Sequence, residues 1–153
     1  MQPQRAKSSV ELTRLYGRDF FEWGRRNAET LRGSQPERAD IDHLAVEIED
    51  MGIRDLRALD SHVGGLLVHL LKLRFQPEKK SRPWRNTVVT QRKSIEVLLN
   101  RNPSLRRMIA KNVAANYGFA VRSASIQTGL AAGTFPAECP FTVAQTLHPE
   151  FLP

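Results

Sequence analysis

Apolar residues recur every three or four positions over a long central stretch, residues 40–75. This spacing places them on one face and predicts a single long amphipathic helix. Asp40 is expected to cap its beginning, and Pro77 prevents continuation beyond its end. A kink or break at Gly52 remains an alternative to a continuous helix, because glycine costs about 1 kcal/mol relative to alanine inside a helix. The stripe comprises Ile41, Leu44, Ala45, Ile48, Gly52, Leu56, Leu59, Val63, Leu66, Leu67 and Leu70.

Three further segments show helical spacing: residues 19–31, residues 84–102 and residues 103–129. Gly33 is expected to stop the first of them and Gly129 the last. The pattern predicts apolar faces that pack on the long helix. These faces comprise Phe20, Trp23, Ala28 and Leu31, with Phe21 beside them; then Trp84, Val88, Ile95, Leu98 and Leu99; then Leu105, Ile109, Val113, Asn116, Ala120, Ala124 and Gln127.

The last two dozen residues are rich in proline and aromatic residues. They predict an irregular strap over the bundle, anchored by Phe135, Phe141, Leu147 and Phe151, with one short helix after Thr142. No alternating strand pattern of convincing length is present. The sequence therefore predicts an all-α, single-domain helical bundle of about four main helices with this C-terminal strap. Residues 1–15 are expected to be disordered and residues 16–153 to form the domain.

The formal charge of +7 is concentrated in one part of the chain. Residues 72–122 carry 13 Lys and Arg against two Glu, whereas the segments on either side are each slightly acidic. Such a segment is typical of a surface that meets an acidic partner. Trp84 lies within it and is a candidate for stacking on a base. The candidate binding residues are Lys72, Arg74, Lys79, Lys80, Arg82, Trp84, Arg85, Arg92 and Lys93.

Other features narrow the cellular setting. The lone Cys139 argues against a disulfide framework and favours a reducing, cytoplasmic environment. No run of apolar residues is long enough to span a membrane, and the first residues lack the apolar core of a secretory signal. The chain is therefore expected to be cytoplasmic, without a membrane partner.

Several sequence blocks occur in an order that resembles a known family. They are LAVEIEDMG, SHVGGLLVHLLKLRFQPEKKSRPWR, QRKSIEVLLNRNPSL, and then QTGL, FPAECPF and HPEFLP. Together they resemble the bacterial domain-of-unknown-function family 29 over about residues 16–153. The resemblance implies a compact helical fold and no assigned reaction. It marks Glu47, His69, Gln76, Pro77, Trp84, Gln91 and Arg92 as positions with a shared role, while Val46 and His43 depart from the usual family pattern.

Two histidines on the long helix offer a second candidate site. His62 and His69 are seven residues apart and so lie on the same side of a helix, in a stripe that is expected to face inward. If the helix that begins at Trp84 returns antiparallel, Gln91 or Arg92 approaches His69. This pattern indicates either a polar interior site, with His69, Arg92 and Gln91 as weak catalytic candidates, or a half-buried histidine whose hydrogen bonds are simply satisfied.

Two other candidate sites are less favoured. His43, Glu47 and Asp50 stack on one helix face, but no second Glu-x-x-His accompanies them, so acids suited to the helix dipole are preferred over a metal site. Cys139 precedes His148 by nine residues, and this spacing alone does not establish a nucleophile and its base. The sequence also has no phosphate-binding glycine loop, no G-x-S-x-G and no H-E-x-x-H.

The preferred hypothesis is a non-enzymatic binding module. It uses the basic surface of residues 72–111 for an acidic partner, nucleic acid first, and needs no metal or cofactor. An enzyme with an interior site around His69 and Arg92 is one alternative. A protein–protein adaptor or homodimer built on the exposed side of the long helix is the other.

Overall fold

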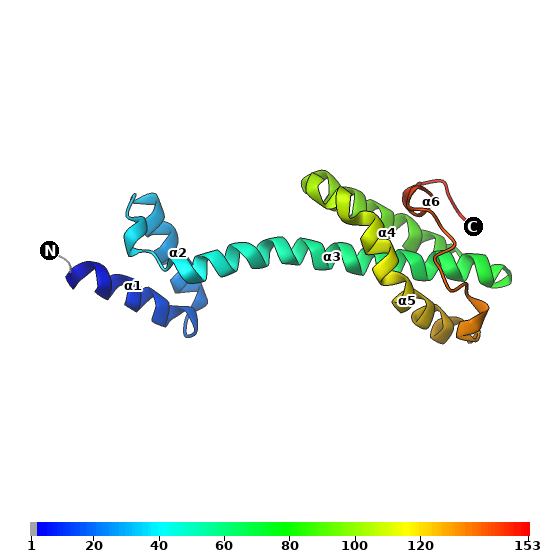
Figure 1. The fold of residues 1–153 in the computed structure, drawn as a ribbon, viewed down its shortest axis with the longest axis horizontal. Coiled ribbons are helices and arrows are strands. Elements are labelled where there is room, and N and C mark those ends of the chain that lie inside the picture. The colour runs from blue at the N-terminus through cyan, green and yellow to red at the C-terminus, as the bar shows by residue number, and fades with distance from the viewer. Residues whose placement is uncertain (1–2) are drawn as a thin grey trace. The chain divides into compact units, whose positions relative to one another are not determined.

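The computed structural model describes residues 3–153, with side chains from Ser9 onward. These residues form six α-helices and contain no strand, so the predicted all-α fold is confirmed. Short 3-10 turns join several of the helices. The helices, labelled in Figure 1, are α1 (Pro3–Tyr16), α2 (Phe20–Arg32), α3 (Ile41–Phe75), α4 (Arg82–Arg101), α5 (Ile109–Thr128) and α6 (Val143–Leu147).

The chain divides into two compact units, Met1–Ile53 and Arg54–Pro153. The sequence predicts a disordered start over residues 1–15, whereas the structure has helix α1 from Pro3 to Tyr16, with Leu12 buried. Met1 and Gln2 lie outside the described residues. A single domain over residues 16–153 stays a prediction.

The core of the first unit is small and centres on Trp23. Asp19 caps α2, because its Oδ1 accepts a hydrogen bond from the backbone N–H of Glu22 at 3.0 Å. Trp23 is only 3 % exposed, but three other apolar side chains of the predicted α2 face are exposed. The prediction of a broad buried face on this helix is therefore wrong. The side chains in question are Phe20, Phe21 and Leu31.

Helix α3 has nearly the predicted bounds and continues through Gly52 without a break. Only the later part of its predicted apolar stripe is buried, from Leu59 onward, whereas Ile41 and Ile48 are exposed. The reason is that α1 and α2 meet the start of α3 through polar residues, as the hydrogen bond from Tyr16 to Glu47 shows. The predicted apolar face is therefore a core face in the second unit alone.

The second unit is built around the C-terminal half of α3. Its leucines are buried on almost every side, because α4, α5 and the C-terminal strap all pack against it. Helix α4 returns antiparallel to α3, since Trp84 near its start meets Lys72 and Gln91 farther along meets His62. The buried core comprises Leu59, Val63, Leu66, Leu67, Val68, Leu70, Leu71, Leu73, Val88, Ile95, Leu99, Ile109, Val113, Tyr117, Ala120, Ala124, Phe135 and Phe141.

The C-terminal segment is the predicted strap. Gly129 ends α5 in the left-handed conformation, with φ at 76°, as the sequence predicts. Thr142 starts α6 with a capping box, in which Thr142 and Gln145 exchange side chain–backbone hydrogen bonds. Phe135 and Phe141 are buried, and Leu147 and Phe151 pack on the core. Among residues 3–153, no helix combines the length and apolar character needed to cross a membrane.

Candidate functional site

The first candidate site is a group of cations between α3 and α4. Gln76 holds the connection in place, since its buried side chain donates to the carbonyl of Thr128 at 3.4 Å. Pro77 begins the following 3-10 turn and Pro83 is the second residue of α4, positions where the missing N–H costs nothing. We call the cations of this connection and its flanks the basic loop cluster. It comprises Arg74, Lys79, Lys80, Arg82 and Arg85.

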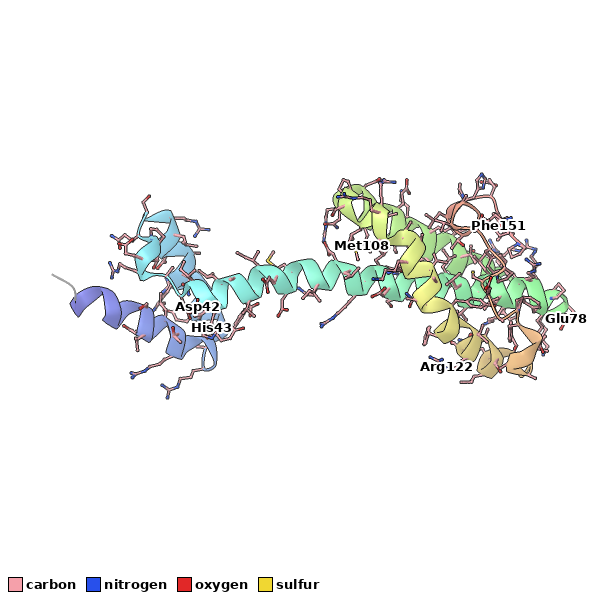
Figure 2. The ribbon with its side chains drawn as sticks, viewed as in Figure 1. Asp42, His43, Glu78, Met108, Arg122 and Phe151 are labelled. Carbon is pink, nitrogen blue, oxygen red and sulfur yellow. The ribbon has the colours of Figure 1, made fainter. Side chains whose placement is uncertain are left out.

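The basic loop cluster is exposed to a partner, although Arg74 also contacts the strap at the carbonyl of Pro140 and the ring of Phe141. Four of its side chains are exposed and Lys80 is half-buried. Among the residues that the structure describes, none of the five forms an ion pair with a carboxylate. Glu78, labelled in Figure 2, is the one acid within residues 74–85. The local field is therefore strongly positive.

Lys72 and Trp84, both predicted for the same surface, contact each other instead. Lys72 is 6 % exposed, and its Nζ donates to Oε1 of Gln127 at 2.9 Å. The ammonium also lies 4.3 Å from the centre of the Trp84 ring. Burial lowers the pKa of Lys72. This pair therefore fastens the end of α3 to α4 and α5.

Arg92 and Lys93 are neighbours in sequence with different environments. Arg92 is 7 % exposed and donates to the carbonyls of Thr146 at 2.9 Å, Pro149 at 3.2 Å and Gln145 at 3.3 Å. It therefore holds α6 and the strap to α4. Lys93 is exposed and pairs with Glu96 at 2.9 Å, one turn along the same helix.

The second candidate site is a cavity of about 490 Å³ in the second unit, which is widely open to solvent. His69 and Gln91 both line it, whereas Arg92 does not. The structure thus places Gln91 with His69, and Arg92 elsewhere. Residues of α3, α4 and α5 form the walls: Asp60, Ser61, Gly65, Val68, His69, Gln91, Asn116, Phe119, Ser123 and Gln127.

Hydrogen bonds fix the state of the two principal cavity side chains. Nδ1 of His69 lies 3.0 Å from the carbonyl oxygen of Gly65, so Nδ1 carries the proton and Nε2 of the neutral ring is an acceptor. Burial lowers the pKa of His69; the bond to Gly65 opposes this shift and the charge of Lys72 adds to it. His69 is therefore neutral at pH 7. Oε1 of Gln91 accepts from Nδ1 of His62 at 2.6 Å, which turns the amide nitrogen of Gln91 away from His62.

Two glycines let the cavity walls approach α3. A Cβ at Gly65 would lie 3.4 Å from Nε2 of Gln91, and one at Gly64 would lie 3.3 Å from the Phe119 ring and 3.4 Å from Oδ1 of Asn116. The sequence pattern allows close helix approach at this pair, and the tight contact at Gly64 agrees with it, whereas the distance at Gly65 is an ordinary van der Waals contact.

Asp60 and Asn116 also line the cavity, and sequence reasoning missed both as site residues. Oδ1 of Asp60 accepts from the side chain of Asn112 and, at 3.3 Å, from that of Asn116. The available signal was the presence of Asn116 and Gln127 in an otherwise apolar stripe of α5.

The first unit contains a separate polar cluster around Asp40. Its carboxylate accepts from Nε1 of Trp23 at 3.1 Å and from Nδ1 of His43 at 2.8 Å, so the predicted helix cap instead binds two rings. The ring of Tyr16 lies against that of His43, tilted by 31° with ring centres 4.0 Å apart, and its hydroxyl donates to Glu47 at 2.6 Å. Figure 2 labels His43 in this cluster.

Neither of the less favoured sites gains support. Among residues 3–153, no group of three potential ligands is placed to hold a metal ion. Burial raises the pKa of Cys139, which keeps the thiol protonated, and its Sγ lies 3.5 Å from the carbonyl of Phe141. His148 accepts a hydrogen bond from the backbone N–H of Glu150 at 3.2 Å.

The remaining candidate surface is the start of α3, on which the adaptor or homodimer alternative depends. Within the first unit this helix bears several exposed apolar side chains, of which Ile48 is 67 % exposed. The others are Ile41, Val46, Met51 and Ile53.

Most positions marked by the family resemblance make specific contacts. Glu47 binds Tyr16, Gln91 binds His62, and Arg92 binds the strap. Gln76 and Trp84 contact Thr128 and Lys72, and His69 lines the cavity. Pro77 begins a 3-10 turn.

Comparison with known proteins gives one informative result. Neither the curated proteins nor the solved structures provide a match. The model of the family described as "Domain of unknown function DUF29" matches residues 15–152. Because this match covers nearly the whole chain, the chain belongs to the DUF29 family.

Proposed function

We propose that the protein is a non-enzymatic binding module whose basic loop cluster holds an acidic partner, nucleic acid first. The observation that carries the proposal is the set of five cations within residues 74–85, none of them in an ion pair among the described residues. Unpaired Lys and Arg side chains bind phosphate oxygens and release the counterions that surround a nucleic acid. Structural cations such as Lys72 and Arg92 contribute no phosphate contact in this proposal.

The proposed surface is smaller than the basic segment of the sequence, because some cations of that segment are buried. Lys72 and Arg92 each have protein partners, and Trp84 is half-buried beneath Lys72. A partner is therefore expected to meet the connection between α3 and α4 rather than all of residues 72–111. Arg92 also lies outside the cavity of His69, and this separation supports the binding module over an enzyme built on that pair.

The test is fluorescence anisotropy with labelled 20-nucleotide RNA and duplex DNA, at several salt concentrations between 50 and 200 mM. We expect the affinity to fall with salt, with a log–log slope of about −0.9 per phosphate contact on the duplex. In the variant K79A/K80A/R82A/R85A, we expect binding at least tenfold weaker and a shallower slope.

The matched control removes four exposed arginines outside the cluster, in the variant R14A/R18A/R32A/R57A. Both variants lose the same net charge, so they separate a local surface from general electrostatic attraction. The control is expected to bind within about threefold of the unmodified protein. Equal losses in both variants, or no binding at 50 mM salt, would overturn the proposal.

A further inference from the structure

The cavity between α3, α4 and α5 presents polar atoms whose hydrogen bonds are not used by the protein. Nδ1 of His69 is occupied by the Gly65 carbonyl, which leaves Nε2 as a free acceptor. Oε1 of Gln91 is occupied by His62, which leaves two N–H donors on its amide nitrogen. Both side chains line the same cavity.

The side chains that carry the free donor and the free acceptor both lie against Gly65. The amide nitrogen of Gln91 lies over Gly65, 3.4 Å from the position that a Cβ would occupy there. The ring of His69 is bonded to the carbonyl of the same glycine. A Cβ at position 65 would be in ordinary van der Waals contact with the Gln91 amide, so the amide lies directly over this glycine.

The rest of the lining determines which chemistry fits. Phe119 is 52 % exposed and offers an aromatic face, and Val68 adds apolar surface. Asp60 is the one charged side chain among the lining residues, and its Oδ1 is already held by Asn112 and Asn116. The negative charge of Asp60 and the absence of a cation in the lining disfavour an anion, and the two groups with free hydrogen-bonding atoms, His69 and Gln91, are neutral. A neutral, flat ligand is therefore favoured.

We propose that this cavity binds a small, neutral, planar molecule that carries a hydrogen-bond acceptor beside an N–H donor on one edge, as a pyrimidine base does. The acceptor of the ligand receives a hydrogen bond from the amide nitrogen of Gln91, and its N–H donates to Nε2 of His69. The flat face of the ligand packs on Phe119. This site is independent of the basic loop cluster, because no residue of the cluster lines the cavity and the ligand carries no phosphate for the cluster to bind.

The experiment is titration of the full chain with uracil, followed by ligand-observed NMR and isothermal calorimetry at pH 7.5. The matched ligand is 1,3-dimethyluracil, which has the same ring but no N–H donor. We expect saturable binding of uracil and at least tenfold weaker binding of the dimethyl compound, because a site built to hydrogen-bond a group discriminates against an analogue that lacks it. No saturable binding of uracil up to its solubility, or equal binding of both compounds, would overturn the proposal.

Variants then test the two named side chains. Gln91→Glu keeps an acceptor for His62 but removes the N–H donors, and His69→Phe removes the acceptor while keeping a planar ring. Each is expected to weaken uracil binding at least tenfold. His148→Phe, at an exposed site outside the cavity, is the matched control and should leave binding unchanged. Unchanged binding in both cavity variants contradicts the proposal, and if either variant fails to fold, the comparison of the two ligands on the unmodified protein decides.

The loop variant K79A/K80A/R82A/R85A separates this inference from the proposed function. It should bind uracil with unchanged affinity while losing nucleic acid. A parallel loss of uracil binding in that variant would show that the ligand sits at the loop and would overturn the assignment to the cavity.

Discussion

Gln91 and Arg92, adjacent residues of α4, show how far a sequence can predict the position of single side chains. The pattern predicts that Gln91 or Arg92 approaches His69, and the structure places Gln91 beside it. Consecutive helical residues point about 100° apart, so only one of the two can face the cavity. Which one does so depends on the rotation of α4, and this rotation is set by packing with distant segments. The carbonyls that bind Arg92 come from the strap, more than fifty residues later.

Arg92 offers the clearest stability test at this scale. The substitution Arg92→Met should destabilise the fold by about 2–3 kcal/mol, because one buried and two partly buried hydrogen bonds from a charged group to carbonyls are lost. The measurement is urea unfolding at pH 7, and faster proteolysis after residue 142 should accompany the loss.

The neighbouring substitution Lys93→Met is the control for Arg92. It removes an exposed ion pair with Glu96, and such pairs contribute about 0–1 kcal/mol. If both variants unfold at the same urea concentration, Arg92 does not anchor the strap.

At the scale of elements, the spacing of apolar residues predicted where the helices are better than it predicted which of their faces are buried. The bounds of α3 were predictable because the apolar period extends over its whole length. The exposure of Ile48 was not predictable, because the same apolar spacing occurs on a helix face that packs against another element and on one that does not. Helix α1 was not predicted, because its first residues are mostly polar. The burial of Leu12 depends on contacts with other segments, which the spacing of apolar residues does not reveal.

The end of α5 gives an element-scale prediction. Gly129 has φ at 76°, a conformation that costs residues with a Cβ about 1–2 kcal/mol. Gly129→Ala should therefore destabilise the protein by about that amount, measured as a lower midpoint of thermal unfolding. Gly133→Ala is the matched control, because Gly133 has no positive φ and a Cβ there meets no atom within 4 Å. Equal midpoints for the two variants would show that the left-handed turn is not needed to end the helix.

At the scale of the whole molecule, the buried residues are shared unequally between the two units. Every residue of the main core cluster lies between Leu59 and Phe141. The first unit buries few apolar residues, chiefly Leu12, Trp23 and Ala39, and relies on hydrogen bonds around Asp40. Sequence composition could not show this difference, because apolar residues such as Phe21 and Met51 occur in the first unit but are exposed.

This inequality leads to a prediction about fragments. Residues 54–153 should fold alone and unfold cooperatively, because they contain a complete core and a chain length typical of a domain. A start at Arg54 also leaves Asp55 near the new helix N-terminus, where an acid is favourable, and keeps its bonds to Arg101 and Asn102. Far-UV circular dichroism during thermal unfolding is the measurement.

Residues 1–53 should be marginal when isolated, because so small a chain buries too little apolar surface to offset its conformational entropy. A helical, cooperatively melting 54–153 fragment beside a mostly unfolded 1–53 fragment would locate the folding unit in the second half. If the 54–153 fragment is instead unfolded while the full chain melts in one transition, residues 16–153 form one domain and the contacts made by the first unit are required for the core.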